Sequence, residues 1–251
     1  MVFGNWKFQG IAMLALAGLL PAAGVVAADG DQRIEVVRFA KDASSATLTG
    51  SIKGYQYVDY KVRAGAGQTL SVMLKSGNPQ NYFNINPPGT ETSMFIGSTS
   101  GHQAKRVLPN DGDYSVRVYL MRAAARRDET ASYTLTVSLD GKALPALSAA
   151  KDAVIRGTPF HASANMACTR TDNAQYRRCD GYVIRRGYDG TATLELRWPD
   201  GIKRSVLFAR MQPTASDSPN TMTFTRTGEV TVVSIGKDER YEVPDVLLTG
   251  G

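Results

Sequence analysis

The stretch YSVRVYLMRAAARRDETASYTLTVSL, residues 114–139, places a basic, alanine-rich insert between two segments of alternating apolar and polar residues. Alternation with a period of two, in residues rich in valine, threonine and tyrosine, is typical of β-strands with one buried face. The insert MRAAARRDE has three alanines and no β-branched residue. We therefore expect a long loop or a single helical turn there. Arg122 and Arg126 lie four positions apart and would share a face of such a turn.

The same alternation extends outward from this stretch, from Arg33 to about Leu139. Its strand-length segments are RIEVVRF, ATLTGSI, QYVDYKV, QTLSVML, YFNI, YSVRVYL and SYTLTVSL. Turn signals rich in glycine, proline, asparagine and aspartate separate them, at 65–67, 76–79, 87–89 and 110–113. Many short strands without a convincing amphipathic helix predict an all-β fold, here an antiparallel β-sandwich.

A second, small β-rich domain is expected after a small-residue connection. The alternation lapses in DGKALPALSAAKD and then resumes in GYVIRR, TATLELRW, IKRSVLFAR, TMTFTR, EVTVVSI and RYEV. Pro199-Asp200-Gly201, between two of these segments, is a strong hairpin signal. We therefore expect a β-sandwich over residues 29–140, a linker over 141–152 and a C-terminal β-rich domain over 153–251.

The first 28 residues have the pattern of a cleavable signal peptide. Lys7 supplies a positive charge, residues 11–20 form an apolar run, and residues 26–28 (VAA) fit a signal peptidase site. An apolar run of about 10 residues is well short of the roughly 20 that span a bilayer, and no later run is longer. The sequence therefore predicts export, to the periplasm or beyond the cell, and no membrane span.

The two cysteines, Cys168 and Cys179, both lie in the second half of the chain. In an exported protein they are expected to form a disulfide that closes a short loop. The alternative, a reactive or metal-binding pair, lacks CxxC spacing and has only His161 nearby as a further ligand. We expect no metal and no cofactor.

The composition argues against several functions. The net charge of +6 is modest and dispersed, so it favours an acidic partner surface but does not indicate nucleic-acid binding. The chain has two histidines, His102 and His161, and no GxSxG-type serine motif. Asp111 and Asp113 lie in a turn that lacks the closing glutamate of a calcium loop. We therefore expect a protein that is not an enzyme.

The basic insert suits binding to carboxylates, because an arginine keeps its charge and can engage a carboxylate with two parallel hydrogen bonds. The alternative is a solvated basic loop in which Arg122, Arg126 and Arg127 lie near Asp128 and Glu129. Ordinary strand packing is likewise the default explanation for the tyrosine-rich segment at residues 55–60.

These segments resemble a known family. GSIKGYQYVDYKVRAGAGQTLSVML, YFNINPPG and LPNDGDYSVRVYLMRAAARRDETASYTLTV are similar, in order and spacing, to the periplasmic inhibitors of g-type (goose-type) lysozyme, over residues about 34–139. The resemblance implies a compact antiparallel β-sandwich that blocks the enzyme's cleft, which carries an essential glutamate and acidic neighbours. It also implies that Tyr55, Arg122 and Arg126 occupy the blocking positions.

The C-terminal part departs from this family. It resembles a β-domain of other exported bacterial proteins with no activity that we can name, which leaves open a contact with peptidoglycan or another envelope component. Two functions other than lysozyme inhibition are also possible from the sequence: an envelope-associated glycan- or protein-binding accessory module, and an unrecognised enzyme.

Overall fold

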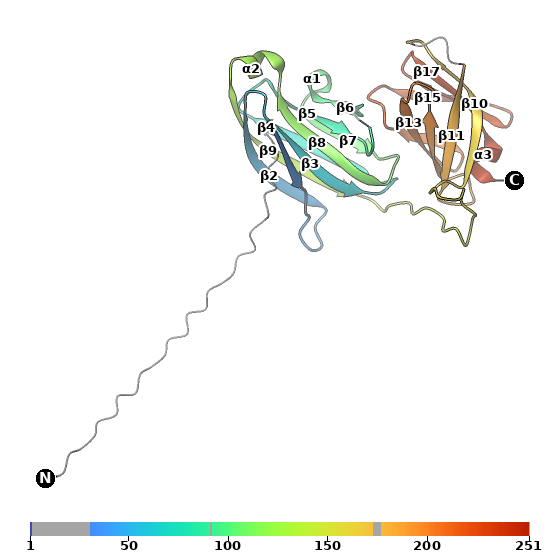
Figure 1. Cartoon of the computed structure of the whole chain (residues 1–251), viewed down its shortest axis with the longest axis horizontal. Coiled ribbons are helices and arrows are strands. Elements are labelled where there is room, and N and C mark those ends of the chain that lie inside the picture. Colours follow the sequence, from blue (N-terminus) through green and yellow to red (C-terminus); the bar gives the residue numbers. More distant parts are fainter. Residues whose placement is uncertain (2–30, 91, 173–176, 251) are drawn as a thin grey trace.

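The structure, a computed structural model, describes residue 1 and residues 31–90, 92–172 and 177–250 (Figure 1). The expected signal peptide therefore lies outside the described residues, apart from Met1. The structure is 54% strand and 6% helix, the latter in three short helices, so the predicted all-β class is confirmed. Among them, no helix is long and apolar enough to cross a membrane.

Two sheets form the N-terminal sandwich. The five-stranded sheet has the order β1 (Gln32–Val36), β3 (Tyr57–Ala64), β8 (Gly112–Leu120), β5 (Asn81–Asn86) and β6 (Phe95–Ile96). The four-stranded sheet has the order β2 (Ser45–Lys53), β9 (Thr130–Asp140), β4 (Thr69–Ser76) and β7 (Gln103–Val107). Helix α1 (Gly97–Ser100) follows β6, and α2 (Arg122–Arg126) connects β8 to β9.

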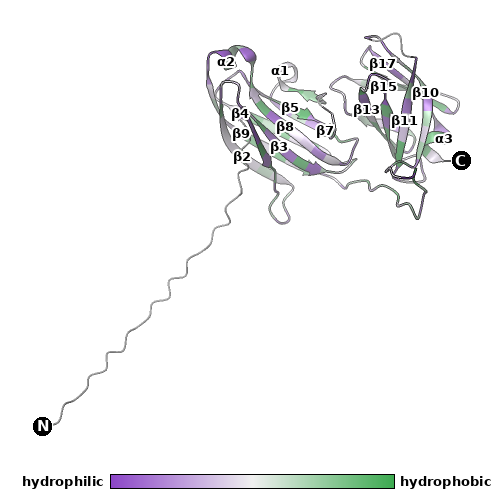
Figure 2. Cartoon of the chain, in the orientation of Figure 1, coloured by the Kyte–Doolittle hydropathy of each residue, from purple (hydrophilic) through white to green (hydrophobic). Residues whose placement is uncertain are grey.

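The strand alternation builds the core between these sheets. Val58, Tyr60 and Val62 of β3 point inward and are fully buried, while the residues between them point outward. Tyr60 meets Tyr133 of the opposite sheet, with 2.9 Å between the two hydroxyl oxygens. Figure 2 shows the resulting alternation of hydrophobic and hydrophilic residues along the strands, and hydrophilic residues at the two ends of α2.

The C-terminal strands form one eight-stranded sheet that curls into a nearly closed barrel. Its order is β14 (Gln212–Ser216), β13 (Lys203–Ala209), β12 (Ala192–Arg197), β11 (Arg178–Arg185), β10 (Ala162–Arg170), β17 (Glu239–Pro244), β16 (Val230–Ile235) and β15 (Met222–Thr227). Helix α3 (Asp245–Thr249) follows β17. This sheet encloses its own apolar core, distinct from that of the sandwich.

The disulfide prediction is confirmed, because Cys168 of β10 is bonded to Cys179 of β11. The Pro199-Asp200-Gly201 turn joins β12 to β13, and Gly201 N donates a hydrogen bond to Trp198 O at 2.9 Å. Between β9 and β10, residues 141–161 form no strand. The two separate cores support our proposal that the chain divides into two domains near this segment.

The observed strands differ from the predicted ones in two ways. Strand β1 pairs with β3 in parallel, whereas the sequence predicted antiparallel pairing only. Strands β6, β7, β10 and β14 were not predicted. Their sequences explain this: β6 has two residues, β7 is QAKRV, β10 is ASANMACTR with mostly small side chains, and β14 is QPTAS with an internal proline. The proline is tolerated because β14 is an edge strand.

Candidate functional site

The basic insert forms the five-residue helix α2, at the end of the sandwich where β8 leads into β9 (Figure 1). Ala124 and Ala125 are buried against the core, whereas Arg122 and Arg126 are exposed. The helix ends where Arg127 N donates to Ala124 O and Asp128 takes a positive φ of 54°. The buried alanines therefore hold the helix down while both arginines project into solvent.

The turn between β2 and β3 lies directly against the end of α2. Gly54 N donates a hydrogen bond to Glu129 O at 3.0 Å, and Lys53 Nζ lies 2.7 Å from Asp128 Oδ2. Gly54 has a φ of +58°, and a β-carbon there would lie 2.8 Å from Asp128 Oδ1, so this position needs glycine. The next residue, Tyr55, is 58% exposed. The fold thus brings Tyr55 to the end of the sandwich that carries Arg122 and Arg126.

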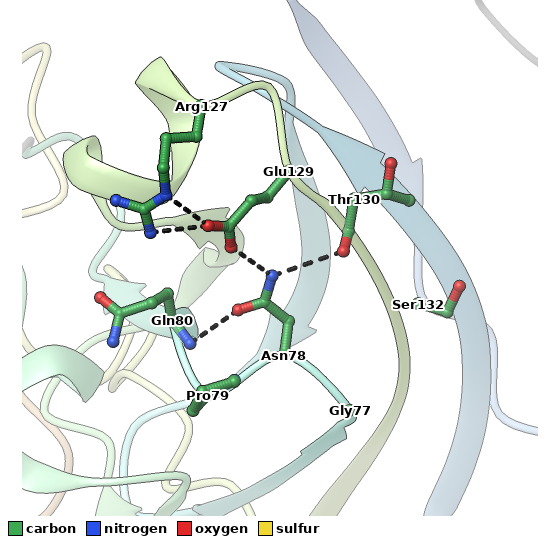
Figure 3. A pocket seen from close by; sticks show the side chains of 8 residues that line it. All are labelled: Gly77, Asn78, Pro79, Gln80, Arg127, Glu129, Thr130 and Ser132. Atoms are coloured by element: carbon green, nitrogen blue, oxygen red, sulfur yellow. Dashed lines mark hydrogen bonds and ion pairs between the residues drawn. The ribbon is translucent and has the colours of Figure 1, made fainter.

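A further turn at this end of the sandwich, between β4 and β5, forms hydrogen bonds with the residues that follow α2 (Figure 3). Asn78 Nδ2 donates to Glu129 Oε2 at 2.9 Å, and Glu129 also forms an ion pair with Arg127 at 2.6 Å. The hydrogen bond from Asn78, together with the bond and charge of Arg127, lowers the pKa of Glu129. These residues line an open hollow with Gln80, Thr130 and Ser132.

The three arginines of the insert are not equivalent. Arg127 is neutralised by Glu129. No ion pair or hydrogen bond within the described part of the chain involves the side chain of Arg122 or Arg126. Arg122 and Arg126 lie four positions apart on a helical turn, so their side chains share one face of it. The solvated-loop alternative therefore describes Arg127, which has an acidic neighbour as its partner, better than it describes the other two.

Some supporting residues were not identified from the sequence. Asn78 lies in a segment that the sequence marks only as a turn, and Gly54 lies outside the turn signals identified from the sequence. Their contacts with residues 128–129 join segments far apart in the chain. Of the three tyrosines at 55–60, only Tyr60 is fully buried, whereas Tyr57 is half-buried beneath the guanidinium of Arg117, which lies 4.4 Å from the ring centroid.

Neither histidine lies in a reactive cluster. His102 stacks on Tyr82 with 4.8 Å between ring centroids, and its Nε2 lies 3.1 Å from Asn81 O. His161 is buried, and its Nδ1 accepts a hydrogen bond from Arg185 N. Within residues 31–90, 92–172 and 177–250, no three histidine, cysteine or acidic side chains gather where they could hold a metal ion.

The chain was compared with family models, curated proteins and solved structures. No family model matches it. An inhibitor of g-type lysozyme from Escherichia coli (strain K12) is 31% identical over 106 residues, which is 41% of this chain and 78% of that protein.

Two solved structures are also similar, each covering 44% of this chain. A periplasmic lysozyme inhibitor of g-type lysozyme from Aeromonas hydrophila is 35% identical over 98% of its own chain, with a TM-score of 0.40. The inhibitor from Salmonella Typhimurium is 26% identical over 99% of its chain, with a TM-score of 0.35. On the identity and coverage of the Escherichia coli relative, the chain belongs, through its N-terminal part, to the family of inhibitors of g-type lysozyme.

Proposed function

We propose that this chain inhibits g-type lysozyme by inserting Arg122, Arg126 and Tyr55 into the enzyme's acidic active-site cleft. The observation that carries the proposal is the convergence of two unpaired, exposed arginines and an exposed tyrosine at one end of the sandwich, in a chain that belongs to the inhibitor family. The mechanism is occlusion, in which no bond is made or broken.

The physical basis is the pairing of guanidinium groups with carboxylates inside a cleft. An arginine that enters a desolvated site lined by carboxylates gains charge-assisted, bidentate hydrogen bonds. The ring of Tyr55 offers an apolar face and a hydroxyl, which suits a pocket shaped for a sugar. Such centrally buried arginines and tyrosines typically carry most of the binding energy of a protein interface.

We also propose that the chain acts in the periplasm, after an export signal over residues 1–28 has been removed. The names of the Aeromonas hydrophila and Salmonella Typhimurium relatives describe periplasmic inhibitors. The charge pattern and the short apolar run at the N-terminus support the same location for this chain.

An inhibition assay with a double variant tests the proposal. The wild-type chain should inhibit a g-type lysozyme, and Arg122→Ala with Arg126→Ala should weaken inhibition by about 100-fold, because two interface anchors are lost. The melting temperature should change little, since both side chains are exposed and unpaired.

The matched control is Arg38→Ala with Arg156→Ala, which removes the same charge from two exposed arginines elsewhere. This control should inhibit like the wild type, apart from a small loss of electrostatic attraction. An equal loss of inhibition in both double variants would show that net charge, not the α2 site, drives binding. Absence of inhibition by the wild type would overturn the proposed function itself.

A further inference from the structure

The outward face of the five-stranded sheet is not part of the inhibitory site and has an unusual composition. We call it the polar sheet face. Its side chains form three rows across β3, β8 and β5, set by the strand register: Tyr57, Tyr119 and Tyr82; Asp59, Arg117 and Asn84; Lys61, Ser115 and Asn86. Directly opposed residues on neighbouring strands point to the same side of a sheet, so each row is continuous.

The first row is aromatic and partly exposed. Tyr82 stacks on His102, and the guanidinium of Arg117 lies over Tyr57. The hydroxyl of Tyr119 donates to Asn84 Oδ1 at 3.2 Å. Within the described residues, the hydroxyls of Tyr57 and Tyr82 have no hydrogen-bond partner. The row therefore presents three half-exposed rings, and two of their three hydroxyls have no hydrogen-bond partner among the described residues.

The second row is a fixed ion pair. Asp59 is almost fully buried and accepts hydrogen bonds from Arg117 Nε and Nη2, both at 2.8 Å, and from Gln32 Nε2 at 2.9 Å. Burial raises the pKa of Asp59, but these bonds and the charge of Arg117 outweigh burial and lower it below its usual value. The pair is thus ionised and internally neutral, and it forms a rigid floor for the face.

The third row opens into a hollow of about 220 Å³ at the end of the face away from α2. Ser115 lines this hollow, is 6% exposed, and its hydroxyl has no hydrogen-bond partner in the described part of the chain. Asn86 Oδ1 accepts a bond from Ser93, which leaves the amide nitrogen as a donor. Lys61 also lines the hollow and forms no ion pair with any described residue. The other charged side chains that line the hollow, Asp113 and Arg117, form ion pairs with Arg63 and Asp59. A buried hydroxyl without a partner, beside a lysine that forms no ion pair with a described residue, favours a polar, acidic ligand.

We propose that the polar sheet face binds a short acidic oligosaccharide. Sugar rings combine apolar C–H faces with hydroxyl edges, and this matches a row of aromatic rings beside rows of hydrogen-bonding side chains. A carboxylate on the sugar would pair with Lys61 in the hollow, where Ser115 and Asn86 add donors. Successive rows lie two residues apart on each strand, so the face extends about 13 Å from the first row to the third, a span for two or three sugar units.

Calorimetric titration of the exported chain tests this proposal. The probe is a tetrasaccharide of alternating N-acetylglucosamine and N-acetylmuramic acid, and the same tetrasaccharide with its carboxyl groups reduced to alcohols is the neutral counterpart. The acidic probe should bind, and the reduced probe should bind about tenfold more weakly, because the ion pair with Lys61 is lost. Failure of the acidic probe to bind at millimolar concentration would overturn the proposal.

A pair of double variants locates the site. Lys61→Gln with Ser115→Ala should weaken binding of the acidic probe by about tenfold or more without lowering the melting temperature, since the Ser115 hydroxyl makes no bond to lose. The matched control is Lys105→Gln with Ser71→Ala, a lysine and a serine that also face each other, on the four-stranded sheet. This control should bind like the wild type.

The remaining outcomes are also decisive. Equal weakening in both double variants would reject the polar sheet face as the binding site. If Lys61→Gln with Ser115→Ala instead lost inhibition of lysozyme while the sugar never bound, the face would be a protein contact and the oligosaccharide proposal would be wrong. Retained inhibition together with lost sugar binding supports it, and this result is independent of whether the arginine site works as proposed.

Discussion

At the scale of single residues, the balance of charge decides which groups are available to a partner. Arg127 is neutralised by Glu129, and Lys53 by Asp128. The two acidic residues after α2 are thereby used to hold the turns together. Arg122 and Arg126 therefore keep their full charge for a partner, and their attraction to an acidic enzyme should raise the association rate at low ionic strength.

The ionisation of Glu129 gives a prediction about pH. Because the pKa of Glu129 is lowered in the folded chain from its ordinary value of 4.5, its contribution to stability is complete above about pH 4.5 and is lost as the pH falls through the lower folded value. Glu129→Gln should therefore lower the melting temperature at neutral pH, and this difference should shrink below about pH 4. Thermal unfolding measured across this range checks it. A difference that stays constant or grows with acidity would contradict this role of Glu129.

At the scale of elements, α2 is too short to be stable by itself and depends on its packing. Ala124 has no exposed surface, whereas its neighbour Ala123 is exposed. Small side chains at the buried positions let the turn lie close to the core, and they thereby set the orientation of both arginines. The element works as a fixed support, which lowers the entropy that binding would otherwise cost.

A pair of leucine substitutions tests this support. Ala124→Leu should lower the free energy of unfolding by about 1–3 kcal/mol through overpacking. It should also weaken inhibition, because α2 must shift. Ala123→Leu adds the same atoms in solvent and should leave stability and inhibition nearly unchanged. Urea denaturation and inhibition assays give both readouts. Equal effects of the two variants would show that the packing of α2 does not position the arginines.

The strands with clear alternation and the helical turn could be predicted from the sequence, because both are local patterns. The contact between the β2–β3 turn and α2 could not be predicted, since it depends on the register of β2 against β9. Lys53 pairs with Thr130 there, which places Gly54 and Tyr55 beside residues 128–129. The strands it missed, such as β10 and β14, are held in the sheet by their neighbours and not by strongly alternating side chains.

At the scale of the whole molecule, the C-terminal strands contact the end of the sandwich opposite α2. Strand β8 begins near this contact and ends at α2, nine residues later. Thr193 donates to Pro109 O at 2.7 Å, and Asn110 donates to Ser205 at 2.9 Å. Arg186, whose side chain is fully buried, donates to Thr193 and lies 2.9 Å from Asp111 as an ion pair rather than an aligned hydrogen bond. The end of the sandwich that carries α2 is therefore left open by the second set of strands.

Thr193→Val tests whether this polar contact stabilises the molecule. It leaves the buried Pro109 carbonyl without its donor and should cost about 1–3 kcal/mol in the free energy of unfolding. Thr136→Val, at an outward-facing position on β9, should have a much smaller effect. Neither variant should change inhibition of lysozyme. A loss of inhibition in Thr193→Val alone would show that the C-terminal strands act on the distant α2 site.

A double-mutant cycle between the chain and a g-type lysozyme tests most directly whether Arg122 and Arg126 meet the enzyme's catalytic glutamate. Dissociation constants are measured for the wild-type chain and the Arg122→Ala, Arg126→Ala double variant, each against the wild-type enzyme and against an enzyme whose catalytic glutamate is replaced by glutamine. We expect the glutamine to weaken binding of the wild-type chain by about tenfold or more and to leave binding of the double variant nearly unchanged. Equal weakening for both chains would mean that the arginines and the glutamate do not meet, and would contradict occlusion of the cleft by α2.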